Sequence, residues 1–139
     1  MGIFDGFDFK RKSDAYAILQ RYFAKFGSLY GVNLTNKKDI VDLVESACRD
    51  TPQLLSSKLH RVALSSSIIV YAMDNCLRNG NNETAKFFHH CLGQILIDIE
   101  SGSGEFQLSS NDINTINGCA NLYKEYAEQL DDGIDLANT

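Results

Sequence analysis

The sequence has no long apolar run, and this excludes a fold that is built around a membrane-spanning helix. A membrane span needs about 18 consecutive apolar residues. The longest apolar stretch, Ile68 to Met73, is flanked by three serines at 65–67 and by Asp74. We therefore expect no membrane-embedded segment in this chain.

The first residues also lack the features of an export signal. Residues 1–9 contain no basic segment that leads into an apolar stretch, and they contain no cleavage site. Met1-Gly2 is also how a myristoylation signal begins, but Gly6 stands where that signal requires Ser or Thr. The expected location is therefore the cytoplasm.

The cysteines and histidines lack the spacing of a metal site. The four cysteines are tens of residues apart, and each lies on or beside an apolar helical face: Cys48, Cys76, Cys91 and Cys119. Such residues are expected to be buried free thiols. The histidines form no E-x-x-H or H-x-x-x-H pair. We expect no metal and no other cofactor, and the alternative is a tertiary site of His60, Cys76 and His89.

The sequence has fewer basic residues than acidic ones, 13 against 18, which argues against a nucleic-acid partner. The net charge is -5, whereas binding to phosphate backbones depends on Lys and Arg. Charge is also distributed unevenly, at +3 over residues 1–62 and -8 over residues 63–139. Either the helices of the two halves interleave and cancel this difference, or an acidic face is presented to a basic partner.

Catalytic motifs are missing as well. The serines at 65–67 lie within an expected helix, where hydroxyls bond to the preceding turn. The Gly102-Ser103-Gly104 connector lacks the preceding strand and the following lysine of a phosphate loop. No residue is therefore predicted to be catalytic, and the expected protein is not an enzyme.

Helical spacing is the strongest positive pattern in the sequence. Apolar residues recur at intervals of three and four, which forms a continuous stripe along one helical face. The clearest stripe consists of Ile113, Ile116, Ala120, Tyr123, Ala127 and Leu130, and similar stripes run from Leu55 to Cys76 and from Ala85 to Ile99. We predict an all-α fold, a compact five-helix bundle that forms a single domain over residues 1–139.

Capping residues and glycines place these five helices at 13–30, 36–49, 51–79, 83–100 and 109–132. Ser109 and Asp112 form a capping box for the last helix. The long third helix is expected to be central, because residues 68–72 are apolar on every side. Serines at 56 and 57 indicate a kink or break near Ser56 as an alternative to a continuous helix.

The two ends of the chain are expected to be less regular. Residues 1–12 form an N-terminal arm in this prediction, and residues 133–139 form a loose tail. Phe4, Phe7 and Phe9 alternate with polar residues and glycine in the arm. Aromatic side chains are unfavourable in water, so the arm is expected to pack against the bundle or against a second copy. A membrane-surface role is the alternative.

Helical positions with unusual residues suggest surfaces for contact. Gly93 and Gly118 lie inside expected helices, where each costs about 1 kcal/mol relative to Ala. They indicate close approach of a neighbouring helix or, as the alternative, of a ligand. Partner-binding residues are predicted on one side of the last helix, at an isolated apolar position and in the arm: Asn114, Asn117, Asn121, Ile97, Phe4 and Phe7.

These observations favour a non-enzymatic helical protein–protein interaction module, such as a small adaptor, inhibitor or chaperone-like protein. We expect a homodimer and a further protein partner that the sequence does not identify. The alternative is an enzyme or small-ligand-binding protein, with a pocket between the third, fourth and fifth helices. Its predicted lining is Tyr71, His89, Gly118 and Tyr123, with His60 as a further candidate.

Overall fold

The computed structural model describes residues 6–34, 36–102 and 106–138, and side chains from Phe9 to Leu130 within these ranges. This part of the chain contains helices and no strand. The elements are α1 (Gly6–Phe26), the 3-10 helix η1 (Gly27–Tyr30), α2 (Lys37–Asp50), α3 (Gln53–Ser56), α4 (Arg61–Arg78), α5 (Asn82–Ser101) and α6 (Ser110–Asn138). The predicted all-α fold is confirmed, with six α-helices in the described residues instead of five.

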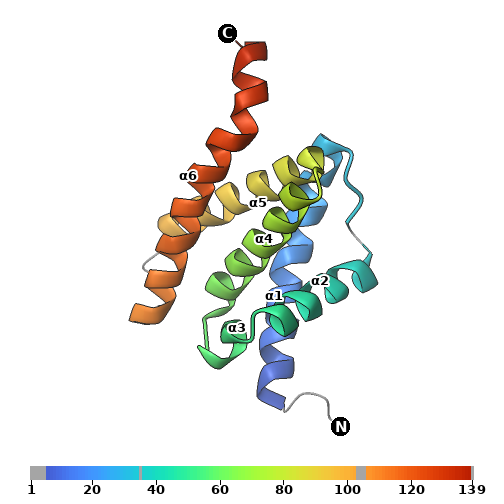
Figure 1. Cartoon of the computed structure of the whole chain (residues 1–139). Coiled ribbons are helices and arrows are strands. Elements are labelled where there is room, and N and C mark those ends of the chain that lie inside the picture. Colours follow the sequence, from blue (N-terminus) through green and yellow to red (C-terminus); the bar gives the residue numbers. More distant parts are fainter. Residues whose placement is uncertain (1–5, 35, 103–105, 139) are drawn as a thin grey trace.

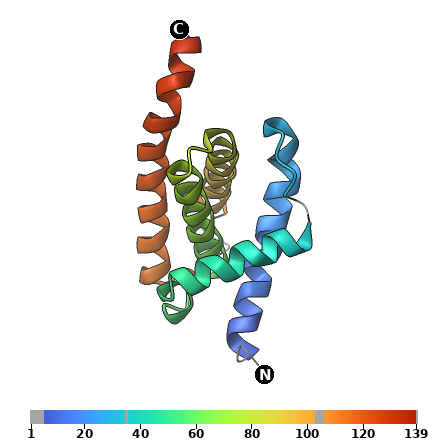
Figure 2. The same cartoon turned by 45° about the vertical axis from the view of Figure 1, so that its right-hand side comes forward.

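Helix α4 lies at the centre of the fold (Figures 1 and 2). It contacts α1, α2, α5 and α6, and it forms an antiparallel hairpin with α5 across a short turn that contains Gly80. Ile68 and Ile69 are fully buried, as are most of their neighbours on the same helix. The prediction that this segment is the central helix is confirmed.

The predicted continuous helix from 51 to 79 is wrong, and the alternative of a break near Ser56 is correct. Helix α3 ends at Ser56, and α4 begins only at Arg61. Between them Lys58 has a φ of 54°, a left-handed conformation that interrupts helical hydrogen bonding. His60 then caps α4, because its Nδ1 accepts a hydrogen bond of 3.2 Å from the backbone N–H of Val62.

One buried carboxylate joins the starts of α4 and α6. Asp112 accepts hydrogen bonds from the backbone N–H groups of Ser109 (2.9 Å) and His60 (2.7 Å). The hydroxyl of Ser109 accepts in return from the N–H of Asp112, at 3.1 Å, which confirms the predicted capping box. We call Asp112, Ser109 and His60 the Asp112 clamp. It holds the first turn of α6 against the N-terminus of α4.

The predicted stripe on α6 is only partly correct. Its first residue, Ile113, is 47% exposed, whereas Leu130 at its other end is buried and Ile116 and Tyr123 pack against the core. Asp112, Cys119 and Tyr126 are also buried, and they share one face because seven residues turn a helix by nearly two full turns. The inward face of α6 therefore includes the side of Asp112 together with most of the apolar stripe.

Both chain ends are more helical than predicted. Helix α1 begins at Gly6, so the expected arm is wrong from residue 6 onward. Phe9 and Tyr16 continue the helical spacing of the following residues, and no helix breaker separates them. The predicted loose tail is also wrong, since α6 passes through Gly133 to Asn138. A single glycine costs a helix only about 1 kcal/mol.

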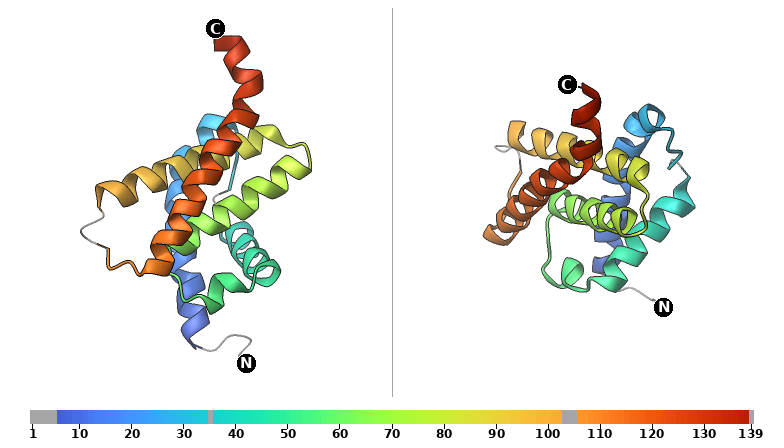
Figure 3. Two further views of the ribbon diagram at one scale, coloured as in Figure 1. Left: turned by 60° about the vertical axis from the view of Figure 1, so that its left-hand side comes forward. Right: turned by 45° about the horizontal axis from the view of Figure 1, so that its top comes forward.

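Helix α6 extends beyond the other helices at the end opposite the start of α1, as all four ribbon views show (Figures 1, 2 and 3). The core between these two ends is rich in aromatic rings. Phe23 of α1 lies 5.4 Å from Phe87 and 5.6 Å from Phe88 of α5, measured between ring centroids. None of the helices in the described part of the chain combines the length and apolarity of a membrane span.

Candidate functional site

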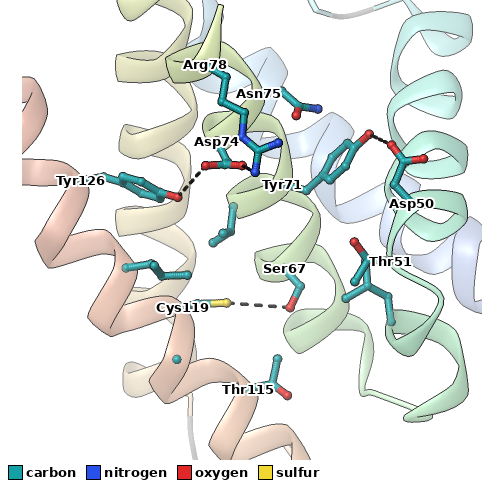
Figure 4. A pocket seen from close by; sticks show the side chains of 14 residues that line it. Asp50, Thr51, Ser67, Tyr71, Asp74, Asn75, Arg78, Thr115, Cys119 and Tyr126 are labelled. Atoms are coloured by element: carbon teal, nitrogen blue, oxygen red, sulfur yellow. Dashed lines mark hydrogen bonds and ion pairs between the residues drawn. The ribbon is translucent and has the colours of Figure 1, made fainter.

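A groove of about 650 Å³ lies between the end of α2, the outer face of α4 and α6 (Figure 4). Its apolar lining includes Leu54, Val70 and Leu122. Polar side chains gather toward the C-terminal half of α4, where Tyr71 and Arg78 face the groove. We call this site the polar groove. It contains two of the four residues of the predicted ligand pocket, Tyr71 and Gly118.

Five polar side chains of this groove are already bonded to one another. Tyr71 donates its hydroxyl to Asp50 Oδ2 at 2.5 Å, and Tyr126 donates to Asp74 Oδ1 at 3.3 Å. Asp74 also pairs with Arg78, with Nη2 and Oδ2 at 2.8 Å (Figure 4). A ligand that bound these groups would have to displace their internal hydrogen bonds. Each hydrogen bond to the ligand would be about as strong as the internal one that it replaced.

The same contacts fix the protonation states in the groove. The hydrogen bond to Asp50 raises the pKa of Tyr71 and lowers the pKa of the carboxyl. Burial, followed by the charge of Asp74, raises the pKa of Tyr126. Both hydroxyls therefore remain protonated at neutral pH, and they act as hydrogen-bond donors.

The thiol in this groove is not activated. Cys119 lies 3.9 Å from the hydroxyl of Ser67, and burial raises the pKa of Cys119. A thiol needs a lowered pKa to act as a nucleophile at neutral pH. Three of the four cysteines are buried and Cys76 is half-buried, and all are free thiols, so the prediction for them is largely confirmed.

The predicted ligand pocket is not assembled as expected. Tyr71 and Gly118 line the polar groove, but His89 and Tyr123 do not. Instead, the rings of His89 and Tyr123 stack at 4.0 Å, and His89 Nε2 lies 2.9 Å from the backbone oxygen of Tyr123. The predicted four-residue pocket is therefore wrong, because two of its members bind each other between α5 and α6.

The two mid-helix glycines have different surroundings. A Cβ at Gly93 would lie 2.8 Å from Tyr123 Oη, so this glycine admits the ring of Tyr123 from α6. A Cβ at Gly118 would meet nothing within 4 Å. Close approach of a neighbouring helix is thus confirmed at Gly93 alone, and Gly118 faces the open polar groove.

The histidines lie apart from one another. His60 caps α4 beside the ring of Phe106, and about 22 Å of helix separates it from Cys76 at 1.5 Å per residue. The tertiary site of His60, Cys76 and His89 is therefore wrong. His90 is half-buried, with Nδ1 2.9 Å from Tyr30 Oη. Among the described residues, no three His, Cys, Asp or Glu side chains are grouped as metal ligands.

A second groove, of about 510 Å³, lies between the first half of α1 and α2. Its lining is mainly apolar: Phe9, Tyr16, Val41 and Val44, together with Ser13, Lys12, Lys37 and Glu45. Phe9 is 62% exposed at its edge. Lys12 Nζ and Glu45 Oε1 bridge the two helices at 3.1 Å. We call this site the apolar groove.

The sequence pointed to one side of the apolar groove and missed the other. Phe9 was expected in an irregular arm, and its helical spacing to Ser13 and Tyr16 is the signal that places it on α1. The α2 side was missed, because no residue of this helix was among the predicted partner-binding residues. Val44 is buried, whereas Val41 is only half-buried at the groove.

The predicted partner-binding residues lie on three different helices. The three asparagines at 114, 117 and 121 are exposed along α6, and Ile97 is 57% exposed on α5. Phe4 lies outside the described residues, as does the side chain of Phe7, although the backbone of Phe7 belongs to α1. A partner-binding role for these residues stays a prediction.

Comparison of the chain with protein-family models, with curated proteins and with solved structures finds no match.

Proposed function

We propose that this protein is a non-enzymatic, helical protein–protein interaction module that binds an amphipathic helix in the apolar groove. One observation carries the proposal: a groove of about 510 Å³ between two helices, with Phe9 62% exposed at its edge. Leaving a Phe side chain in water forgoes roughly 2 kcal/mol of burial energy. A partner helix that covers Phe9 and Val41 would recover this energy.

The shape of the site fits a helix better than a small polar molecule. Two helices with an apolar trough between them accept the apolar face of a third, with anchor residues at intervals of three and four. Lys12 and Glu45 of the groove pair with each other, and the exposed Lys37 favours acidic residues beside that apolar face. The expected partner is therefore an amphipathic helix with acidic flanks.

A small-ligand function for the polar groove is the second candidate. The convergence of Tyr71, Asp74 and Arg78 beside an apolar lining favours it, since binding pockets combine these features. These three side chains are paired within the protein, however, and this makes the polar groove the weaker candidate of the two.

The proposed location is the cytoplasm. The four cysteines remain free thiols, and three of them are buried. Free thiols persist best in a reducing compartment. We also propose self-association, since an exposed apolar groove is available to a second copy.

A photo-crosslinking amino acid tests the proposed docking site. It is placed at Phe9 in the groove or, as a matched control, at Leu29, which is 65% exposed on η1. Irradiation in native lysate is expected to give discrete protein adducts at position 9, which Val41→Asp removes, and diffuse labelling at position 29. Equal labelling at the two positions, or adducts that survive Val41→Asp, would contradict the proposal.

A further inference from the structure

A third groove is built on α1, beside the start of α4. One cavity of about 470 Å³ lies between the middle of α1, the start of α4 and the end of α5, and a smaller cavity of about 190 Å³ adjoins it. Asp14 and Arg61 line both cavities. The rings of His60 in the smaller cavity and Phe106 in the larger one pack with their centroids 5.6 Å apart. We call this continuous site the basic groove.

Basic side chains outnumber acidic ones in this groove, although the whole chain has a net charge of -5. The charged lining consists of four cations and two carboxylates: Lys10, Arg11, Arg21 and Arg61, with Asp14 and Asp98. All four cations belong to the positively charged first part of the sequence, residues 1–62. A recess with an excess of one charge attracts ligands of the opposite sign. The basic groove is therefore suited to an anion.

Two of these cations are not committed to the protein itself. Arg21 and Arg61 are exposed, and neither forms a hydrogen bond or an ion pair within the described ranges of the chain. In the polar groove, by contrast, Arg78 is paired with Asp74. A guanidinium carries five N–H donors and can bind a phosphate through two parallel hydrogen bonds. A phosphate that binds Arg61 would therefore displace no internal contact of that side chain.

The larger cavity adds an apolar surface with carboxylates beside it. Ile95 and Ile99 are buried in its wall, and Ile18 is half-buried there. Its volume lies within the range of about 300–1,000 Å³ that is typical of small-molecule sites. The oxygens of Asp14 and Asp98 accept hydrogen bonds from hydroxyl and N–H groups. A hydrocarbon tail has no such donors, whereas a nucleoside combines an aromatic base with hydroxyl donors.

Both carboxylates can accept further hydrogen bonds. Asp14 Oδ2 accepts from Lys10 Nζ at 3.2 Å. Asp98 accepts from the hydroxyl of Tyr22 and, at 3.0 Å, from Gln94 Nε2. A carboxylate has about four acceptor positions, so ribose hydroxyls can be bound without loss of these internal bonds.

We propose that the basic groove binds a mononucleotide. The phosphate lies in the smaller cavity against Lys10 and Arg61, and the base lies against Ile18 and Ile99 in the larger one. Arg21 provides a planar guanidinium that stacks on the base. The phosphate supplies the negative charge that the groove favours, and the base covers its apolar wall.

This site is separate from the proposed docking site for a partner helix. Phe9 and Tyr16 of the apolar groove lie about 140° around α1 from Asp14 and Arg21, at about 100° per residue. The nucleotide and the partner helix therefore use different faces of α1. Crosslinking at Phe9 tests the docking site alone, so the failure of one proposal does not imply the failure of the other.

Isothermal titration calorimetry of the full-length chain tests the nucleotide site. The probes are the 5′-monophosphates of adenosine, guanosine, cytidine and uridine. At least one of them is expected to bind, one per chain, with a Kd of about 0.1 mM or tighter. The corresponding nucleoside and inorganic phosphate should each bind at least about tenfold more weakly, because each lacks half of the contacts.

Two variants locate the bound nucleotide, and a third controls for the change in net charge. Arg61→Gln should remove the difference in affinity between the nucleotide and its nucleoside, because it removes the unpaired cation beside the phosphate. Ala17→Glu adds a carboxylate at an exposed position of the larger cavity, one turn before Arg21, and should weaken the binding of both ligands. Lys38→Gln removes an exposed cation of α2 and should bind like the wild type. Circular dichroism confirms that each variant is folded.

Four outcomes would overturn the inference. The first is the absence of binding by all four monophosphates at about 1 mM. The second is a nucleoside that binds as tightly as its nucleotide, which would show that the phosphate is not recognised. The third is nucleotide binding that survives both Arg61→Gln and Ala17→Glu, which would place the ligand elsewhere. The fourth is binding of decanoate in the absence of nucleotide binding, which would assign the groove to anions with a hydrocarbon tail.

Discussion

Asp112 is the side chain whose loss should matter most at the residue scale. It is 4% exposed, yet its charge is compensated by N–H donors from two separate segments. Burial raises its pKa, but the hydrogen bonds from His60 and Ser109 outweigh this effect and bring the pKa below the usual value. The folded protein therefore favours the ionised form of Asp112.

We predict that Asp112→Ala lowers the free energy of unfolding by about 2–4 kcal/mol, because two backbone N–H groups lose their acceptor. Urea denaturation monitored by circular dichroism measures this change. Glu128→Ala, on the exposed side of the same helix, is the matched control and should change stability by no more than about 0.5 kcal/mol. Equal effects would contradict the role of the Asp112 clamp.

The same cluster makes stability depend on pH in a defined direction. Burial, followed by the charge of Arg61, lowers the pKa of His60 below 6.5. The unfolded chain then binds the proton more readily, so the stability contributed by neutral His60 is lost as pH falls below 6.5. Asp112, with a lowered pKa, loses its contribution only in more acid solution, as pH falls below 3.8.

We predict that His60→Asn removes the first of these two steps and keeps the second, because Asn can still cap α4 but does not titrate. Melting temperatures between about pH 2 and about pH 8 provide the measurement, since this range covers both steps. An unchanged pH profile in His60→Asn would show that another group causes the loss of stability in mild acid.

At the scale of elements, Gly93 controls how closely α5 and α6 can pack. The ring of Tyr123 occupies the space that a side chain at position 93 would fill, and its stacking on His89 limits its movement. Gly118 lies within α6 with open space around it. Substitutions at these two positions therefore distinguish the cost in stability of a glycine within a helix from the gain in stability that close helix packing gives.

We predict opposite signs for the two alanine substitutions. Gly118→Ala should stabilise the protein by up to about 1 kcal/mol, since alanine is the better helix former. Gly93→Ala should destabilise it by about 1–3 kcal/mol, because overpacking displaces Tyr123. Denaturation curves test the pair, and stabilisation by Gly93→Ala would show that α6 can move away without cost.

The same elements show what the sequence could predict. Caps and terminal glycines located most helix ends, because these signals are local: Asn36 caps α2, and Asn81 caps α5. The break at Lys58 was only an alternative, since nothing in the side chain of lysine favours a positive φ. The exposure of Ile113 and the burial of Asp112 were missed, because the bond from His60 that holds Asp112 inward joins residues that are 52 positions apart.

The candidate grooves were harder to predict than the helices. Tyr71 was predicted to line a pocket and Phe9 was placed only in the N-terminal arm, and the surfaces around them depend on how α2 crosses α1 and approaches α4. Helix crossing is set by the packing of whole faces, which the periodicity of a single helix does not determine. For this reason the sequence grouped His89 and Tyr123 with Tyr71, whereas in the fold His89 and Tyr123 stack on each other apart from Tyr71.

At the scale of the whole molecule, one contiguous core links all the helices. It includes Leu19 of α1, Val44 of α2, Leu54 of α3 and Cys119 of α6, all arranged around α4 and α5. A single cluster of this kind gives no helix a separate core of its own. The chain should therefore gain and lose its structure as one unit.

We predict a single cooperative unfolding transition in which two independent probes coincide. Far-ultraviolet circular dichroism reports the helices, and tyrosine fluorescence reports packing around side chains such as Tyr126. A midpoint for tyrosine fluorescence that lies clearly below that of the helical signal would contradict a single core.

The Asp112 clamp also has a kinetic consequence. The hairpin of α4 and α5 closes through a short turn, whereas the bond between His60 and Asp112 must close a loop of 52 residues. Such distant contacts carry a larger entropic cost and tend to form late in folding. Asp112→Ala should therefore accelerate unfolding and leave the refolding rate almost unchanged. On this view the clamp determines how long each folded molecule lasts, and it has little influence on how fast that molecule forms.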